Sequence, residues 1–301
     1  MRILVTDGMD QAAKQQLLAL GHQIAEQFYA PEALGEALRE FDAVIIRSAT
    51  KIRKPQIDAA AGGKLKLIIR AGVGLDNIDV AYAEAAGMIV RNTPRASTNA
   101  VAEMTLAHLF ACARFIGQAN VSMREGKWEK KALSKGFELS GKTIGICGYG
   151  RIGKQVGDYA QSLGMQVLAY DPYPHPEYQC ETMHYVPLDA LLAQADVISL
   201  HLPAVAEPII TAERIAKMHD GVVIINTSRG GNVDENALMD GLNSGKIRAA
   251  GLDVWQEEPA KNTALINHPH VSCTPHIGAS TVEAQSRIGA EIVSIIQGFA
   301  I

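Results

Sequence analysis

Short apolar runs alternate with amphipathic stretches along the first third of the chain. The runs are rich in β-branched residues and occupy residues 2–7, 22–27, 42–48, 65–71 and 88–93. Between them, apolar residues recur at helical spacing, as in residues 9–21, where Gly21 is the expected stop. Strands that alternate with helices predict a parallel sheet covered by helices on both faces.

The alternation breaks at residues 93–128 and then resumes. Pro94 and Ser97 suit a helix entrance, and the apolar positions that follow predict one long helix, buried at a domain or subunit interface. Further strands are expected at residues 143–148, 166–171, 196–202, 221–228, 247–254 and 270–275. The last amphipathic stretch, residues 280–299, has no strand after it, and we expect it to return to the first unit.

A glycine-rich turn opens the second series of strands. Gly148, Gly150 and Gly153 form a G-x-G-x-x-G pattern that follows one expected strand and begins a helix, and Asp171 ends the next strand. This context is the one in which the pattern binds a dinucleotide. Gly148 permits the tight turn, Gly150 lets a pyrophosphate approach the helix N-terminus, and Gly153 lets helix and strand pack closely.

Asp171 favours NAD over NADP as the dinucleotide. Its carboxylate would accept hydrogen bonds from ribose hydroxyls and would repel a 2′-phosphate. No Arg or Lys occurs in residues 172–176, which follow it. A second G-x-G, in residues 70–79, lacks both the third glycine and the acidic residue, so it is interpreted as a substrate-facing loop.

Polar residues that directly follow the strands of the second unit are candidates for catalysis, because ligands of open parallel sheets bind at that edge. Arg229 could bind a carboxylate with two hydrogen bonds and polarise the adjacent carbonyl. His276 could exchange a proton with that carbonyl oxygen, and Glu258 could orient the histidine. Asp253 could face the nicotinamide or cap a strand, whereas His201 is interpreted as structural.

Composition and charge exclude several classes of protein. The chain has 301 residues, 48% of them hydrophobic, and a net charge of −4, so no overall positive charge favours nucleic acid. Neither a membrane-spanning apolar run nor a signal peptide is expected. The four scattered cysteines predict reduced, mostly buried thiols in a cytoplasmic protein, and no metal site is expected.

Four stretches together resemble the D-isomer-specific 2-hydroxyacid dehydrogenases. They are residues 148–153 with Asp171, 226–235, 249–259 and 274–280, and the similarity extends over essentially the whole chain. The resemblance implies two doubly wound α/β domains with parallel sheets. A Rossmann dinucleotide-binding domain, residues 96–279, would be inserted into a flavodoxin-like substrate domain, residues 1–95 and 280–301.

The resemblance also implies roles for individual residues. The catalytic residues would be Arg229, Glu258 and His276. The NAD-binding positions would be Gly148, Gly150, Arg151, Ile152, Gly153, Asp171, Leu202, Thr227, Ser228, Asp253, Gly278 and Ala279. The substrate-binding positions would be Arg47, Arg70, Ala71, Gly72, Val73, Gly74 and Lys131, the last from the partner of a homodimer formed through the cofactor domain.

Within this family, residues 47–50, 70–79 and 126–146 are most similar to members that oxidise D-3-phosphoglycerate with NAD to 3-phosphohydroxypyruvate, the entry to serine synthesis. Two departures stand out. Val73 replaces a threonine that many relatives carry, and the chain ends at Ile301, where many have a regulatory domain, so feedback inhibition by serine is not expected. The alternatives are a reductase of glyoxylate, hydroxypyruvate or another 2-keto acid, and an NAD-sensing binding protein.

Overall fold

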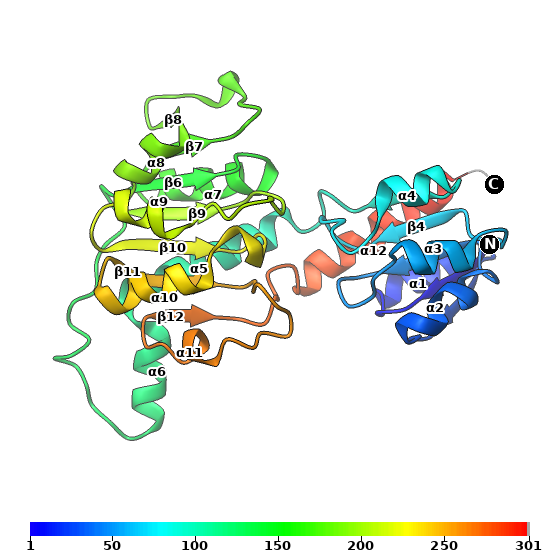
Figure 1. Cartoon of the computed structure of the whole chain (residues 1–301), viewed down its shortest axis with the longest axis horizontal. Coiled ribbons are helices and arrows are strands. Elements are labelled where there is room, and N and C mark those ends of the chain that lie inside the picture. Colours follow the sequence, from blue (N-terminus) through cyan, green and yellow to red (C-terminus); the bar gives the residue numbers. More distant parts are fainter. Residues whose placement is uncertain (300–301) are drawn as a thin grey trace. The chain divides into compact units, whose positions relative to one another are not determined.

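The computed structural model describes residues 1–299 and consists of two compact units (Figure 1). Unit 1 comprises residues 1–98 and the segment from Ala279 onward, and unit 2 comprises Asn99–Gly278. Both are α/β units with parallel sheets, of five and seven strands, which confirms the predicted fold class.

Unit 1 contains a five-stranded sheet in the order β2-β1-β3-β4-β5, the order of flavodoxin-like folds. Its strands are β1 (Arg2–Val5), β2 (Gln23–Glu26), β3 (Ala43–Ile46), β4 (Leu67–Arg70) and β5 (Ile89–Asn92). Its helices are α1 (Gln11–Ala19), α2 (Pro31–Leu38), α3 (Lys54–Ala60), α4 (Val80–Ala85) and α12 (Val282–Gln297).

Side-chain alternation along the strands divides the core of unit 1 in two. Val44 and Ile46 of β3 belong to the cluster that contains α2, α3 and α4, whereas Ala43 and Ile45 belong to the cluster of α1 and α12. Because both faces are covered, the central strands β1, β3 and β4 are nearly continuous apolar runs. The last helix therefore packs on the first unit, as the sequence predicts.

Unit 2 contains a seven-stranded sheet in the order β12-β11-β10-β9-β6-β7-β8, which is the Rossmann order with one added strand. Its strands are β6 (Thr143–Cys147), β7 (Gln166–Tyr170), β8 (Met183–Tyr185), β9 (Val197–Leu200), β10 (Val222–Asn226), β11 (Ile247–Leu252) and β12 (Val271–Cys273). Its helices are α5 (Thr98–Arg114), α6 (Ile116–Arg124), α7 (Arg151–Ser162), α8 (Leu188–Gln194), α9 (Ala212–Lys217), α10 (Glu235–Ser244) and α11 (Thr263–Ile266), with short 3₁₀ turns at Pro176–Tyr178 and Gly230–Asn232.

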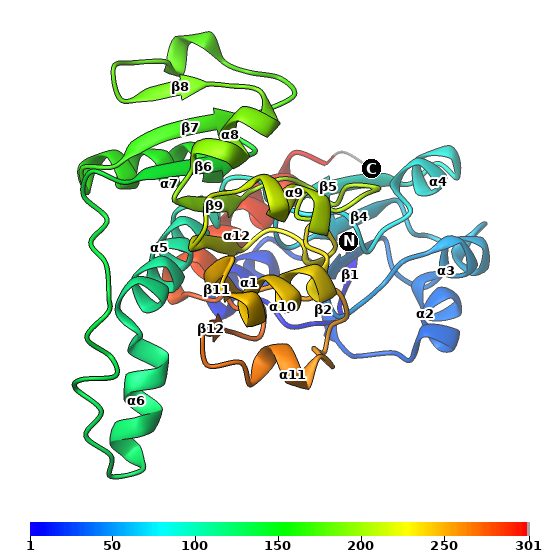
Figure 2. The ribbon, with the colours of Figure 1, turned by 60° about the vertical axis from the view of Figure 1, so that its left-hand side comes forward.

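Three expectations about unit 2 need correction. The long helix is broken at Phe115, whose φ of +54° is left-handed, and α5 and α6 meet at an angle of 66°. Figure 2 shows α6 and the following loop extending away from the sheet. The short strand β8 was not predicted, because residues 183–185 lack a β-branched run. Cys180 and Cys273 are exposed, so only Cys112 and Cys147 are buried thiols.

Within residues 1–299, no single helix is long and apolar enough to cross a membrane. The bent pair α5 and α6 would satisfy that test by length and composition alone.

Candidate active site

The candidate catalytic residues of unit 2 follow three adjacent strands at the carboxyl edge of the sheet. Arg229 lies three residues beyond the end of β10, Asp253 directly follows β11, and His276 lies three residues beyond β12. Because β10, β11 and β12 are neighbouring parallel strands, their carboxyl ends lie at one edge. The fold therefore brings these residues to the edge at which ligands of such sheets bind.

Glu258 and His276 form a hydrogen-bonded pair. Glu258 Oε2 lies 2.8 Å from His276 Nδ1, and the two side chains are 37% and 34% exposed, respectively. Burial acts to raise the pKa of Glu258, but the hydrogen bond and charge of His276, the Trp255 N–H and Arg229 outweigh it, so the pKa is lowered. The carboxylate thus stays charged and stabilises a positive charge on the imidazole.

The turn that carries His276 is held by Asp253. His276 has a left-handed φ of +54°, a conformation that costs free energy in any residue other than glycine. Asp253 is 1% exposed and accepts hydrogen bonds from the backbone N–H groups of Ile277 and Gly278, both at 2.8 Å. A Cβ on Gly278 would lie 2.8 Å from Asp253 Oδ2, so glycine is needed for the carboxylate to approach these N–H groups.

Two buried asparagines shape the Arg229 loop. The Asn226 side chain donates to the Arg229 carbonyl at 2.9 Å and accepts from the Ser228 hydroxyl at 2.8 Å. Asn232, fully buried, donates to the Leu202 carbonyl at 3.2 Å. Gly230 lets this loop approach the next one, because a Cβ there would lie 1.9 Å from the Trp255 backbone. The Arg229 guanidinium donates to the Ser228 carbonyl at 2.7 Å.

The glycine turn after β6 is closely packed at two positions and open at the third. Gly148 has a φ of +91°, and a Cβ there would lie 2.7 Å from the His201 backbone. A Cβ on Gly153 would lie 2.0 Å from the Gly148 carbonyl oxygen, whereas one on Gly150, the residue that caps α7, meets nothing within 4 Å. The open position is where the pattern leaves room for a pyrophosphate.

Asp171 joins the turn to the end of β7. Its Oδ2 accepts from the Tyr149 N–H at 2.7 Å, and its Oδ1 accepts from the Tyr173 N–H at 2.8 Å. Each carboxylate oxygen keeps a lone pair for a ribose hydroxyl. Nearby, the Nε2 atom of His201 lies 2.8 Å from Ser199 Oγ, and its buried Nδ1 has no partner within residues 1–299. Burial lowers the pKa of His201 to about 3, so the ring is neutral.

The remaining NAD positions of unit 2 divide into buried and exposed ones. Thr227, Ser228 and Leu202 are each 8% exposed, and the Thr227 hydroxyl lies 2.8 Å from that of Thr105. Arg151 and Ile152 form the first turn of α7, with Arg151 exposed. Ala279 begins the second segment of unit 1, where its carbonyl accepts from Gln285 at 2.9 Å.

In unit 1, the predicted substrate loop follows β4. Asn92 donates to the Val73 carbonyl at 2.6 Å, and the Thr93 N–H donates to the Gly72 carbonyl at 3.0 Å. Gly72 has a φ of +147°, and a Cβ there would lie 1.4 Å from Arg70 Nη1. The Arg70 guanidinium therefore lies against the loop backbone and braces it. Ala71 is buried, whereas Gly74 is part-exposed.

The loop after β3 holds Arg47 by its backbone. Asp7 accepts from the Arg47 N–H at 2.7 Å, and Asn77 donates to the carbonyls of Arg47 at 2.7 Å and Thr50 at 2.6 Å. These contacts fix the position of the backbone without using the guanidinium. Arg47 is part-buried, so its side chain can be aimed at an anionic group.

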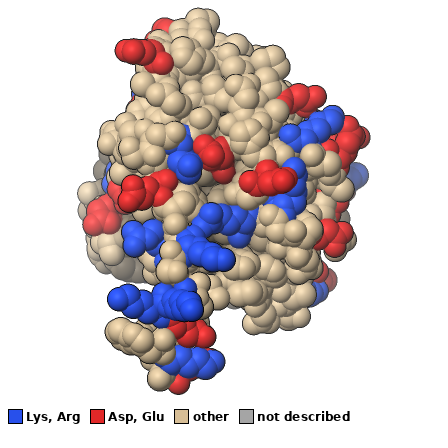
Figure 3. All heavy atoms as spheres, turned by 90° about the vertical axis from the view of Figure 1, so that its left-hand side faces the viewer, with Lys and Arg blue, Asp and Glu red and all other residues tan. Residues whose placement is uncertain are grey.

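Lys131 lies in the loop after α6, where Lys127, Lys130 and Lys135 are also exposed, and Arg124 at the end of α6 is exposed as well. Figure 3 shows Lys and Arg side chains gathered in the lower half of the face turned toward the viewer. Within residues 1–299, no three His, Cys, Asp or Glu side chains are placed to hold a metal ion.

Comparison with known proteins identifies the family. Residues 106–278 match the family described as D-isomer specific 2-hydroxyacid dehydrogenase, NAD binding domain. The chain is 47% identical to a hydroxypyruvate reductase of Thermotoga maritima, over 98% of this chain and 97% of that protein. The chain belongs to the D-isomer-specific 2-hydroxyacid dehydrogenases.

Two further members of the family are similar to the chain over nearly its whole length. It is 43% identical to a D-3-phosphoglycerate dehydrogenase of Methanocaldococcus jannaschii, over 99% of this chain but only 57% of that protein. The chain thus spans little more than half the length of this relative. A crystal structure of a glyoxylate reductase from Paecilomyes thermophila matches with a TM-score of 0.90 and 32% identity, over 99% of this chain and 94% of that one.

The dehydrogenase family takes NAD in this domain, and the residues present fit it. The space above Gly150 suits the pyrophosphate, and the spare lone pairs of Asp171 suit the ribose. Arg151 and Ile152, at the start of α7, would contact the pyrophosphate.

Sequence reasoning overlooked several residues that support the site. Asn226 and Asn232 hold the Arg229 loop, Asn92 holds the substrate loop, and Thr274 contacts Asp253. The two asparagines of the Arg229 loop carried a signal, since each is a polar residue at the end of an apolar strand or beside a glycine pair. Their burial, which reveals their role, depends on tertiary packing.

Proposed function

We propose that Arg229, Glu258 and His276 catalyse the oxidation of a D-2-hydroxy acid and the reverse reduction of a 2-keto acid. The observation that carries this proposal is the 2.8 Å contact between Glu258 and His276 at the ligand-binding edge of the sheet. A carboxylate that holds one ring nitrogen leaves the other nitrogen free for proton exchange with a substrate. A binding module has no use for such a pair.

NAD, which the glycine turn after β6 and Asp171 would hold, would supply the hydride acceptor for C2 of the hydroxy acid and, as NADH, the hydride donor for the reverse reaction. His276 takes the hydroxyl proton during oxidation and gives it back during reduction. Because Nδ1 contacts Glu258, Nε2 is the atom that exchanges this proton. Glu258 stabilises the protonated ring, and Arg229 binds the substrate carboxylate and polarises the carbonyl.

For the substrate, we favour D-3-phosphoglycerate, which would be oxidised to 3-phosphohydroxypyruvate, the first step of serine synthesis. The support comes from the similarity to D-3-phosphoglycerate dehydrogenases and from Arg47, whose backbone is fixed by Asp7 and Asn77. Because these contacts use only the backbone of Arg47, its guanidinium would be available to a phosphate. Lys131 of a partner chain would supply a second cation. Arg70 would contribute indirectly, because its guanidinium supports the backbone of the substrate loop.

A second candidate is the reduction of hydroxypyruvate, a three-carbon keto acid without the phosphate. It is favoured by the 47% identity to a hydroxypyruvate reductase that the chain matches over 97% of its length. Val73, in place of a threonine, leaves the substrate loop with one hydroxyl fewer, which also fits a smaller, less polar substrate. Glyoxylate belongs to the same class.

A substrate panel distinguishes these candidates. We expect kcat/KM with NADH to be higher for 3-phosphohydroxypyruvate than for hydroxypyruvate or glyoxylate, and to exceed the value with NADPH. Arg47→Ala should lower only the value for the phosphorylated substrate, by about tenfold, the cost of one lost charged contact. If a phosphate-free substrate is preferred by about tenfold or more, the phosphoglycerate assignment is wrong.

A variant of His276 tests the catalytic assignment itself. His276→Ala should abolish turnover of every substrate on the panel while leaving the Kd of NADH nearly unchanged, because the ring exchanges a proton and does not hold the dinucleotide. Undiminished turnover in this variant would remove His276 from the mechanism. A wild type that binds NADH but turns over no substrate of the panel would favour the NAD-sensing alternative. We further propose that the enzyme is a cytoplasmic homodimer joined through unit 2.

A further inference from the structure

A chain of hydrogen bonds connects helix α5 to the turn that carries His276. His108, on α5, is 2% exposed, and its Nδ1 and Nε2 atoms lie 2.9 Å from Ser272 Oγ and 3.0 Å from Thr274 Oγ1. The Thr274 hydroxyl donates to Asp253 Oδ1 at 2.5 Å. Asp253 is the carboxylate that accepts the N–H groups beyond His276.

The direction of each hydrogen bond follows from the number of protons. A threonine hydroxyl has one proton, and the proton of Thr274 goes to Asp253, so its oxygen must accept from His108. The ring proton of His108 is therefore on Nε2, and Nδ1 accepts from the Ser272 hydroxyl. Burial lowers the pKa of His108, with the charge of Asp253 opposing, so the ring is neutral at neutral pH. With this arrangement of protons, each hydrogen bond from Ser272 through His108 and Thr274 to Asp253 has one donor and one acceptor.

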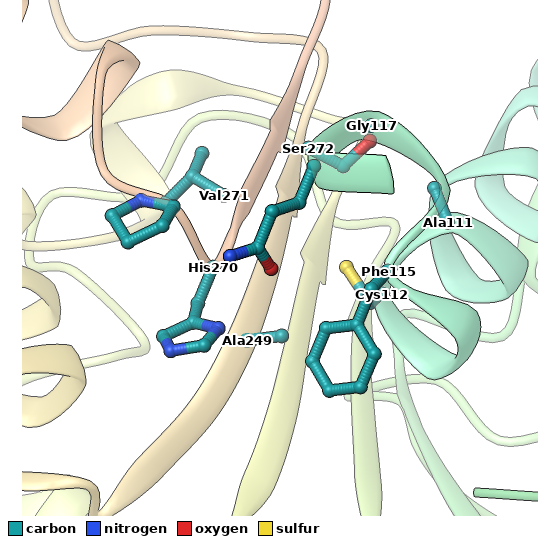
Figure 4. Close-up of a pocket in the computed structure, with 10 residues that line it drawn as sticks. Ala111, Cys112, Phe115, Gly117, Ala249, His270, Val271 and Ser272 are labelled. Carbon is teal, nitrogen blue, oxygen red and sulfur yellow. The ribbon is translucent and has the colours of Figure 1, made fainter. Parts of the chain in front are cut away.

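Helix α5 approaches β11 closely at His108. A Cβ on Gly251 of β11 would lie 2.6 Å from the Cβ of His108, so glycine permits this approach. One turn further along α5, Cys112 lines a pocket of about 20 Å³ together with Ser272 and with Phe115, the residue at the break between α5 and α6 (Figure 4). The hydrogen bonds of His108 to Ser272 and Thr274 connect α5 to β12 and to the residue that follows it.

We propose that His108 is a positioning residue, which fixes the turn of His276 through Thr274 and Asp253. This inference rests on the proposed role of His276. The left-handed φ of His276 is not one that its residue type prefers, so the turn must be held by its surroundings. Asp253 holds it only while the carboxylate keeps its rotamer, and the Thr274–His108 link fixes that rotamer.

The test compares two replacements of His108, with the panel substrate that the wild type reduces fastest. His108→Leu removes both hydrogen bonds and should lower kcat by about tenfold, because small displacements of catalytic groups have effects of this size, with little change in the Kd of NADH. His108→Gln, whose amide N–H can donate to Thr274, should restore most of the loss. Rescue by Gln distinguishes positioning from simple filling of space.

A double-mutant cycle tests whether the residues act as one chain. Thr274→Val should lower kcat about as much as His108→Leu, and the double variant should show little further loss, since either change breaks the same link. Thr274 is part-exposed at the end of β12, so this variant keeps the proposal testable if His108→Leu does not fold. Additive losses in the cycle would overturn the proposal.

Leu109→Val serves as the stability control. Leu109 is a fully buried neighbour of His108 on α5 and belongs to an apolar cluster that includes none of the hydrogen-bonded residues, so the variant should lower Tm without lowering kcat. A folded His108→Leu variant with wild-type kcat would overturn the role of His108, provided that His276→Ala is inactive. An active His276→Ala would instead refute the proposed function.

Discussion

At the scale of single residues, Glu258 determines how the enzyme should respond to acid. Its pKa is lowered because the contacts with His276, Trp255 and Arg229 outweigh the effect of burial. A lowered carboxyl pKa means that the charged form persists below the ordinary value of about 4.3 and is lost only as pH falls through the lowered value. For the reduction, in which His276 enters protonated, the acid limb of the kcat profile should therefore lie below the ordinary glutamate range.

Glu258→Gln provides the measurement for this prediction. The variant should lose that acid limb, and its kcat should fall on the order of 10²-fold, because the protonated form of His276 is no longer stabilised by a charge. Thermal melts of both proteins would show that the fold is intact. A limb at or above the ordinary glutamate range that disappears in the variant would contradict the prediction.

The sequence identified candidate residues more readily than their supports. The sequence points to Arg229, Glu258 and His276 because the ends of the apolar strands can be located in it and few charged residues follow them. The 2.8 Å pairing of Glu258 with His276 could not be predicted, since it depends on how the 254–259 loop returns to the sheet edge. The role of His108 could not be predicted from the sequence, because a histidine within an apolar helix cannot be distinguished from an ordinary core residue until its hydrogen-bond partners are known.

At the scale of elements, the turn between β6 and α7 allows its glycines to be tested separately. A methyl group on Gly153 would collide with the Gly148 carbonyl at 2.0 Å, so Gly153→Ala should lower both Tm and the affinity for NADH. A methyl group on Gly150 meets no protein atom within 4 Å, so Gly150→Ala should keep the wild-type Tm and weaken only NADH binding. Calorimetric titration and thermal melts measure the two effects.

The outcome for Gly150→Ala decides where the dinucleotide lies. Wild-type NADH affinity in this variant would mean that the pyrophosphate does not approach Gly150. An equal loss of Tm in the two variants would mean that a methyl group is as unfavourable at Gly150 as at Gly153, which would contradict the prediction.

The elements themselves were predictable wherever apolar runs were β-branched and uninterrupted. Strands β1, β3, β4 and β10 have such runs. By contrast, β2 has a single β-branched residue, and β8 contains Met, His and Tyr and is specified by its pairing with β7. The break at Phe115 was hidden because apolar spacing continues across it. A left-handed residue that is neither glycine nor asparagine has no sequence signature, and here the ring lies 6.3 Å from that of His270.

At the scale of the whole molecule, the exposed apolar side chains indicate how the chain associates. Phe110, Ile116, Val121, Met123 and Trp128 are 39%, 53%, 57%, 56% and 77% exposed, and all lie within one stretch of 19 residues, 110–128. Clusters of this kind mark protein interfaces. This stretch includes the end of α5 and all of α6, so we expect a homodimer through unit 2.

Light scattering should therefore give a mass of twice the 32.3 kDa chain. The double variant Val121→Glu, Trp128→Glu places charges in the proposed interface and should shift the protein to the monomer mass while unit 2 stays folded, because neither side chain belongs to a core cluster. Leu20→Glu with Phe28→Glu is the matched control: these unit 1 side chains are 48% and 65% exposed, lie outside the stretch, and should leave the dimer intact. A monomeric wild type, or dissociation by both pairs of changes, would place the interface elsewhere or remove it. The Val121→Glu, Trp128→Glu variant also tests the role of Lys131. If this variant is a monomer and loses activity toward the phosphorylated substrate alone, that selective loss would support a contribution of Lys131 from the partner chain.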